Sequence, residues 1–329
     1  MFDSKKSIRV LLLGKGRSLV LWLENLEQAF ISSGYSPAIF VINGDNWTSR
    51  LRSKIKYFDS NSPWMLSKFE LSLNTFHPNL VIIVGAFGIP INHYKIMHSQ
   101  PQRPIVVGLV GDRFSIPDCI ERANLCDKLY FTDTFFLEES KNAGIKANGS
   151  YLPLAVNPEI FRPGYGARRK EILLVASRTE LRESVVRQLH KPAFIIGTDW
   201  STLEQEKFHL VQNRKINRDA VIRLYQHHQA VLNIRNEANV EHGLNQRSFE
   251  PLACGAVVLN DDLPDLEICF EPGKEILVYR NPEELNMLVD RLELDPKFAE
   301  IVAIKGRERI LAEHTFKHRI KKIINDLNM

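Results

Sequence analysis

Short apolar runs alternate with amphipathic stretches along the first half of the chain. Continuous hydrophobic runs without polar alternation are typical of strands buried on both faces of a parallel sheet. Residues 63–76 and the stretch after residue 18 instead repeat apolar side chains at helical spacing. The pattern predicts an α/β domain with helices on both faces of a parallel sheet. The predicted strands are 8–13, 38–42, 80–84, 105–110 and 129–132.

The same alternation begins again after a break at residues 157–166, which contain two prolines and two glycines. The division predicts domains at 1–156 and 170–312, a linker at 157–169, and a final helix within 313–329. A helix is expected over 217–227 with Asn217 as its N-cap. The predicted strands of the second domain are 172–176, 194–197, 209–211, 231–234, 256–259 and 276–279.

Composition narrows the class of protein. A length of 329 residues suits two domains, and 44% hydrophobic with 25% charged residues is typical of soluble globular chains. The net charge of +4 comes from scattered Lys and Arg, which favours a small anionic ligand over nucleic acid. No run approaches the roughly 18 apolar residues of a membrane span. The four cysteines show no metal-ligand spacing, which favours buried free thiols in the cytoplasm, and the N-terminus does not resemble a signal peptide.

The candidate chemistry gathers in residues 241–262. Asn245 is a suitable N-cap for a helix beginning at Gln246, and Gly255 would end that helix. A helix N-terminus after a glycine-containing loop favours anions, and Arg247 adds a full charge in the first turn. Glu250 lies three residues further on, so it would share a helix face with Arg247 at about 5–6 Å. This separation suits a diphosphate and its ribose, although an ordinary surface ion pair has the same spacing.

Residues 242–255 read His-x7-Glu-Pro-Leu-Ala-Cys-Gly, which resembles the donor-site motif of GT-B glycosyltransferases. The usual form has Glu at the first position, where this chain has His242. The run Gly-x-Asn-x-Arg-x-Phe-Glu at 243–250, followed by Asp261 and Asp262, resembles more closely the spore-maturation-protein (CgeB-like) type. A second match, Glu-His-Thr-Phe-x-His-Arg, lies at 313–319. The resemblance is strongest from residue 170 to the end.

The resemblance implies a fold and a substrate. It implies a GT-B architecture, with two Rossmann-like domains whose parallel sheets face a cleft and a C-terminal helix that crosses back to the first domain. The second domain would bind a nucleotide-sugar donor, UDP- or dTDP-linked, with no cofactor and no metal. A glycan, a small molecule or a protein would be the acceptor, with no nucleic acid as partner.

The resemblance also implies roles for individual residues. Glu250 would hold the ribose hydroxyls, and Arg247 would bind the phosphates. The remaining donor-side candidates are His242, Gly243 and Asn245, which would contact the sugar or the phosphates. Arg178 and Arg182 follow strand 172–176, where GT-B enzymes place a phosphate-binding basic residue. A solvated charged face is the alternative for these two arginines.

Two further candidates lie in the first domain. Asp112 follows strand 105–110 and is the best candidate for a general base that takes the acceptor proton; capping of the next helix is the alternative. Gly14 and Gly16 form a Gly-x-Gly turn after the first strand, either as a ligand loop or as a tight turn with Ser18 as helix cap. His242 is the second catalytic candidate.

Two other functions fit the same motifs. One is a nucleotide-sugar-binding protein without catalysis, and the other is a sugar-nucleotide epimerase or hydrolase. A dehydrogenase is disfavoured because the first loop lacks the third glycine of the dinucleotide fingerprint. Asp261 and Asp262 are expected in loop and capping roles, not as a metal site.

Overall fold

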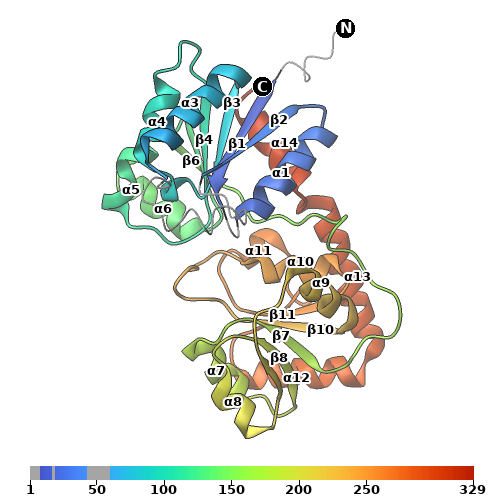
Figure 1. Ribbon diagram of the computed structural model, residues 1–329. Coiled ribbons are helices and arrows are strands. Elements are labelled where there is room, and N and C mark those ends of the chain that lie inside the picture. Colours follow the sequence, from blue (N-terminus) through green and yellow to red (C-terminus); the bar gives the residue numbers. More distant parts are fainter. Residues whose placement is uncertain (1–7, 17–18, 43–59) are drawn as a thin grey trace. The chain divides into compact units, whose positions relative to one another are not determined.

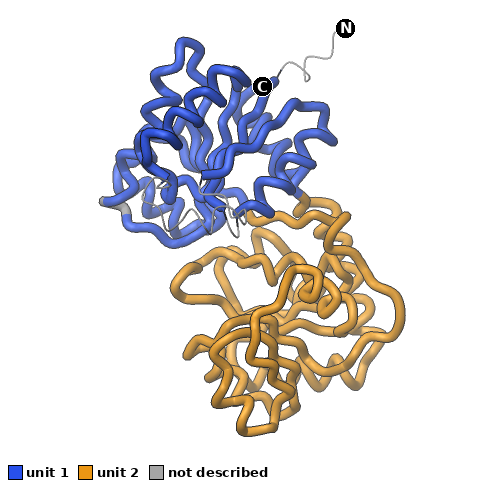
Figure 2. The backbone as a smooth tube through the Cα atoms, viewed as in Figure 1, with its two compact units in different colours: residues 1–152, 316–329 blue, residues 153–315 orange. Residues whose placement is uncertain are grey.

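The computed structural model of the chain describes residues 8–16, 19–42 and 60–329, and it divides into two compact units. Unit 1 comprises residues 1–152 together with 316–329, and unit 2 comprises residues 153–315 (Figure 2). The segment expected as a linker, 157–169, lies inside unit 2. None of the helices within the described ranges combines the length and apolar character that a bilayer crossing requires.

Unit 1 is built on a six-stranded parallel sheet in the order β2-β1-β3-β4-β5-β6. The central strands are buried along nearly their whole length, which explains why they contain so few polar residues. Helices cover both faces of this sheet, with α1 and α14 on one side and α3 and α4 on the other (Figure 1). The strands are β1 Arg9–Lys15, β2 Ser36–Ile42, β3 Leu80–Val84, β4 Ile105–Val110, β5 Lys128–Phe131 and β6 Asn148–Tyr151. The helices are α1 Val20–Ser32, α3 Pro63–Phe76, η4 Ala86–Gly88, α4 Ile91–His98, α5 Ile116–Ala123, α6 Thr134–Asn142 and α14 Phe316–Asp326.

The last helix, α14, belongs to unit 1 although it follows the whole of unit 2 in the sequence. Phe316 packs edge-on against Trp22 of α1, with ring centroids 5.2 Å apart. The Tyr130 hydroxyl of β5 donates to Asp326 Oδ2 at 2.9 Å. Through these contacts the C-terminal helix packs on the first domain, as expected for the GT-B architecture.

Unit 2 contains a second six-stranded sheet in the order β12-β11-β10-β7-β8-β9, again parallel throughout. In its core the sheet packs against α7, α12 and α13. The four cysteines of the chain, two in each unit, are buried and form no disulfide bonds. The strands are β7 Ile172–Val175, β8 Ala193–Gly197, β9 Leu210–Asn213, β10 Ala230–Asn233, β11 Val257–Asp261 and β12 Leu277–Tyr279. The helices are α7 Glu180–Arg187, α8 Ser201–Glu206, α9 Arg218–His227, η5 Gln246–Ser248, α10 Glu250–Ala253, α11 Leu266–Cys269, α12 Pro282–Leu294 and α13 Pro296–Glu313.

The predicted and observed elements differ in a few places. Helices α4, α5 and α8 were not predicted, because their 8, 8 and 6 residues are too few for a helical repeat to be recognised in the sequence. The predicted N-cap Asn217 is confirmed, since its side chain accepts from the Ala220 backbone N–H at 2.9 Å. The predicted cap Ser18 lies outside the described residues, and α1 begins at Val20.

Candidate functional site

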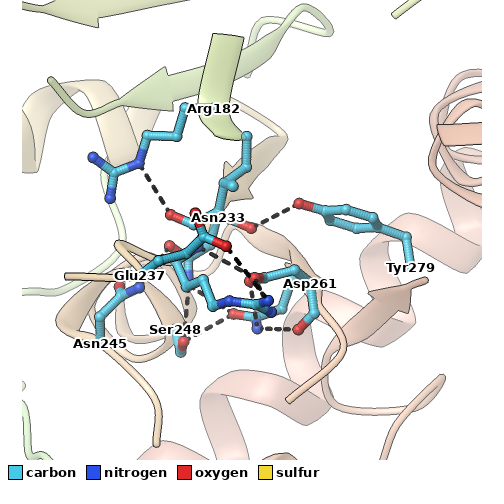
Figure 3. Close-up of polar contacts among 10 residues, drawn as sticks. Arg182, Asn233, Glu237, Asn245, Ser248, Asp261 and Tyr279 are labelled. Atoms are coloured by element: carbon cyan, nitrogen blue, oxygen red, sulfur yellow. Dashed lines mark hydrogen bonds and ion pairs between the residues drawn. The ribbon is translucent and has the colours of Figure 1, made fainter. Parts of the chain in front are cut away.

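Asn233, the last residue of β10, organises the polar site at the carboxyl edge of the unit 2 sheet (Figure 3). Its side chain is fully buried. The carboxamide oxygen accepts from Asn245 Nδ2 and from Arg247 Nε, each at 3.1 Å. The amide nitrogen donates to Asn260 Oδ1 at 2.7 Å and to Ser248 Oγ at 3.0 Å. The side chain therefore uses both donors and both acceptor positions of an Asn amide.

The strands fix this network, because Asn233 and Asn260 are direct partners in the register of β10 and β11. Ser248 Oγ also donates to Asn260 Oδ1 at 2.8 Å, so three fully buried polar side chains are mutually bonded. Buried polar groups are costly unless they are paired, and here each one finds a partner. The network ties residues 245–248 to the ends of two strands.

The predicted helix from Gln246 to the Gly255 turn is wrong in one respect. The segment forms a single 3₁₀ turn, η5, and then the short helix α10, with a break at Phe249. The ends are as predicted: Asn245 Oδ1 accepts from the Arg247 backbone N–H at 2.8 Å, and Gly255 has φ = +73°. Two short pieces align fewer peptide dipoles than one continuous helix, so the side-chain charges matter more than the helix end.

Arg182 and Arg247 converge on this edge from different elements. Arg182 lies in α7 and is buried, and its Nε donates to the Ile234 carbonyl at 3.2 Å while Nη1 donates to the Ser177 carbonyl at 2.9 Å. Burial, followed by the charge of Arg247, lowers the pKa of Arg182 to about 10. Neither the Nη2 group of Arg182 nor either Nη group of Arg247 has an acceptor among the residues that the structure describes. These N–H groups remain available to an anion.

Glu250 is the carboxylate beside Arg247. Burial raises the pKa of Glu250 to about 8, and the positive charge of Arg247 opposes that shift. Within the described part of the chain, no hydrogen bond reaches its carboxyl group. A desolvated carboxyl without a protein partner is suited to bind hydroxyl groups of a ligand.

Asp261 is the other buried carboxylate of the site, and it is the last residue of β11 rather than part of a loop. Burial raises its pKa to about 6, although its Oδ2 accepts from both the backbone N–H and Nη1 of Arg235, each at 3.3 Å. Asp262 instead pairs with Arg280 at 3.1 Å near the surface. Across residues 8–16, 19–42 and 60–329, no group of three His, Cys, Asp or Glu side chains is arranged to hold a metal ion.

The other donor-side candidates lie nearby with different contacts. Arg178 follows β7, and its side chain forms an ion pair with Glu183 of α7. The His242 carbonyl accepts from the Asp265 backbone N–H at 3.1 Å, which anchors the loop before η5. Gly243 is buried in that loop. The phosphate or sugar contacts of these three residues remain predictions.

The unit 1 candidates lie at the carboxyl edge of that unit's own sheet. Asp112 follows β4, and α5 begins after Ser115, so Asp112 is not the residue that precedes the next helix. Partial desolvation raises the pKa of Asp112 although its side chain is exposed. Gly14 lies in β1, where an added Cβ would come within 3.1 Å of Leu23 Cδ1, so close strand-to-helix packing explains this glycine. The Gly16 backbone N–H donates to the Ile42 carbonyl at 3.1 Å.

Sequence reasoning did not identify Asn233, Ser248, Asn260 or Arg235. One signal was available. Asn233 lies inside the apolar run of predicted strand 231–234, and Asn260 directly follows predicted strand 256–259. The carboxyl ends of parallel strands are where ligands bind in α/β sheets, so a polar residue there is informative. The role of Ser248 follows only from contacts across the fold.

Comparisons with known proteins bear on this geometry. Residues 169–325 match the family model described as glycosyl transferase-like. No curated protein sequence matches the chain. The matched residues include the whole carboxyl-edge site of unit 2 and continue into α14.

Solved structures with the same fold include the following three, all at low sequence identity. Sucrose-phosphate synthase from Thermosynechococcus elongatus has a TM-score of 0.70 at 13% identity, covering 97% of this chain and 99% of that one. A glycosyltransferase from Rickettsia africae also has a TM-score of 0.70 at 13% identity, covering 97% of each chain. HepE from Anabaena, solved in complex with UDP and glucose, has a TM-score of 0.69 at 11% identity, covering 98% of this chain and 99% of that one. The chain therefore has the GT-B fold, and its residues 169–325 match the glycosyl transferase-like family model.

Proposed function

We propose that the protein transfers a sugar from a nucleoside-diphosphate sugar, UDP- or dTDP-linked, to a glycan, small-molecule or protein acceptor. The observation that carries the proposal is the donor site, by which we mean Arg182, Asn245, Arg247 and Glu250. In it two guanidinium groups with unused N–H donors lie beside a desolvated carboxyl that has no described protein partner. HepE, which shares the fold, was solved with UDP and with UDP-glucose.

The chemistry follows from the charges. The bond between the anomeric carbon and the diphosphate oxygen breaks, and its electron pair moves onto that oxygen. Arg182 and Arg247 stabilise the developing negative charge, since fixed donors in a desolvated site need no reorganisation during the reaction. Guanidinium groups also bind phosphate oxygens bidentately, which lets them take the place of a metal ion.

The remaining residues have proposed roles in positioning and proton transfer. The Glu250 carboxyl binds the ribose hydroxyls, and Arg178, His242 and Gly243 complete the contacts to phosphate and sugar. In a direct attack the acceptor oxygen bonds to the anomeric carbon and gives its proton to the Asp112 carboxylate. A raised pKa makes Asp112 a stronger base than an ordinary carboxylate.

Two finer assignments belong to this proposal. The Gly-x-Asn-x-Arg-x-Phe-Glu run at 243–250 supports the spore-maturation-protein type of glycosyltransferase. The four buried free thiols support a reducing compartment, and we propose the cytoplasm.

Thermal unfolding with and without UDP tests the donor site. We expect UDP to raise the Tm of the wild type by several degrees, and Arg247→Ala to lose most of that rise, because binding stabilises only the folded state. Arg223→Ala is the matched control, since Arg223 is an exposed arginine of α9 in the same unit. If Arg247→Ala and wild type respond equally, or if no nucleoside diphosphate stabilises the wild type, the donor site is misassigned.

Turnover separates transfer from binding alone. Release of free UDP from UDP-glucose should fall about 2- to 13-fold in Glu250→Ala, the factor expected for loss of one neutral hydrogen bond of about 0.5–1.5 kcal/mol. A protein that binds the donor without turnover would indicate the non-catalytic alternative. Turnover that yields a modified sugar without any acceptor would indicate an epimerase or hydrolase.

A further inference from the structure

A second recess lies in unit 2, at the edge of the sheet opposite the donor site. Three of its lining residues, Lys170, Gln229 and Gly255, come just before strands β7, β10 and β11. The donor site lies where these same strands end, so the two sites are at opposite edges of one sheet. The recess has a volume of about 430 Å³, within the range of ligand pockets.

Arg168 provides the first charge in this recess. Its Nη1 donates to the carbonyls of Tyr225 at 3.0 Å and His228 at 2.9 Å, and its Nη2 donates to the Cys254 carbonyl. All three acceptors are neutral, and no carboxylate lies within ion-pair distance of Arg168 in the described part of the chain. Partial burial lowers the pKa of Arg168. Its Nε–H and one Nη2–H are still available.

Arg307 of α13 provides a second charge. Its Nε atom is buried and has no hydrogen-bond partner, and among the described residues no acidic side chain forms an ion pair with it. Burial and the nearby Glu250 carboxyl raise the pKa of the Cys254 thiol, and the charges of Arg168 and Arg307 oppose that rise, so both guanidinium groups lie near that side chain. Because Nε is closed to solvent, a ligand in the recess would instead bind the Nη groups of Arg307, which have no hydrogen-bond partner among the described residues.

The other lining residues define the ligand's size and charge. Lys170 adds a third cation at the exposed rim, and Glu300 is the one acidic residue of the lining. Three cations against one carboxylate leave an excess of positive charge that matches a phosphate monoester, which carries about −1.5 to −2 near neutral pH. The rest of the wall is largely apolar, including Pro163 and Ile304. Gly255 has no side chain to obstruct the recess, and an added Cβ would lie 3.3 Å from Arg168 Nη2.

We propose that this recess binds a small organic phosphate monoester, with its phosphate on Arg168, Arg307 and Lys170 and its carbon skeleton on the apolar wall. The inference concerns a second site and does not depend on which sugar the donor site uses. A ligand there lies against α13 and the starts of the strands whose ends carry the donor site. It neutralises two guanidinium charges that the protein itself leaves unpaired.

Isothermal titration calorimetry on the full chain tests this proposal, with glucose 6-phosphate as probe and glucose as the uncharged control. Glucose 6-phosphate should bind the wild type, and glucose should not. Arg307→Gln and Lys170→Gln should weaken binding at least about tenfold, the factor expected for one charged hydrogen bond. Lys305→Gln, an exposed lysine of the same helix outside the recess, should bind as the wild type does.

The donor-site variant Arg247→Ala separates the two sites. If the recess is correct, Arg247→Ala keeps its affinity for glucose 6-phosphate. If binding is lost in Arg247→Ala and kept in Arg307→Gln, the probe occupies the donor site and the proposal is overturned. The proposal is also overturned if the wild type does not bind glucose 6-phosphate. Lys170 is exposed, so Lys170→Gln gives a result even where Arg307→Gln fails to fold.

Discussion

Asn233 holds the charged side chains of the donor site in place although no ligand needs to touch it. Its one amide connects the loop that carries Asn245 and Arg247 to the end of β11. The Arg247 guanidinium is thus held through its Nε, which leaves its two Nη groups directed to another partner. Asn233 therefore positions Asn245 and Arg247, and it transfers no proton itself.

Glu250 gives the residue-scale prediction. The folded protein keeps a proton on this carboxyl up to a pKa of about 8, whereas the unfolded chain releases it near 4.5. Between these values the folded state binds more protons, so this group's contribution to stability falls as pH rises. Glu250→Gln cannot ionise and should lack that fall, a difference on the order of 2–4 kcal/mol between pH 5 and pH 8.

Urea unfolding at a series of pH values measures this difference. Glu267→Gln is the control, because Glu267 is exposed on α11 in the same unit. It should follow the wild-type curve. A Glu250→Gln curve that runs parallel to the wild type over the whole pH range would show that the Glu250 carboxyl is solvated as in the unfolded chain.

At the scale of elements, the close approach of α13 and α10 fixes the segment behind the donor site. Gly306 of α13 faces this contact: a Cβ built there would lie 2.4 Å from the Glu275 carbonyl oxygen and 2.7 Å from Leu252 Cδ2. The carbonyl belongs to the backbone and cannot move aside as a flexible side chain would. Only glycine fits at this position of α13, against Leu252 of α10 and the Glu275 backbone in the segment before β12.

Gly306→Ala is the corresponding prediction. The change gains about 1 kcal/mol of helix propensity, but the clash costs about 1–3 kcal/mol or more, so the clash should prevail. We expect the free energy of unfolding to fall, measured by urea denaturation. Lys305→Ala, next to it on the exposed side of α13, should change stability by less than about 0.5 kcal/mol. A more stable Gly306→Ala variant would mean that α13 lies further from Glu275.

At the scale of the whole molecule, the chain crosses from unit 1 to unit 2 and returns, so the core of unit 1 depends on the last residues. Ile323 of α14 is fully buried, and Leu26 of α1 is almost fully buried. Helices α1 and α14 pack together within unit 1. Unit 1 therefore cannot complete its core until α14 has been synthesised.

Ile323→Ala tests this dependence. Removing a buried isoleucine side chain should cost about 2–5 kcal/mol, and the loss should fall on unit 1. In hydrogen exchange, protected amides of residues 60–152 should exchange faster, while those of 153–315 and the UDP response should stay as in the wild type. Lys321→Ala, an exposed residue of the same helix, is the control. Faster exchange in residues 153–315 alone would contradict the assignment of α14 to unit 1.

The sequence by itself determined the two sheets and most of their strands, and it indicated the segment that we propose as the donor site. Apolar runs such as 80–84 and 105–110 mark buried strands because burial on both faces requires hydrophobic side chains at every position. Asn245 and Gly255 mark the ends of the site segment because capping and positive φ are local requirements. Arg247 and Glu250 became candidates through their spacing from the Asn245 cap, and Arg182 through the resemblance to GT-B glycosyltransferases.

Only the tertiary structure decided how these residues meet. The strand order places β7, β10 and β11 side by side, and that order brings Arg182 next to Arg247 across more than sixty residues of sequence. The Asn233 network, the unpartnered Glu250 carboxyl and the recess at Arg168 and Arg307 all depend on such contacts. Local patterns fix backbone conformation and burial, but the pairing or isolation of a buried charge depends on distant segments that only the packed fold brings together.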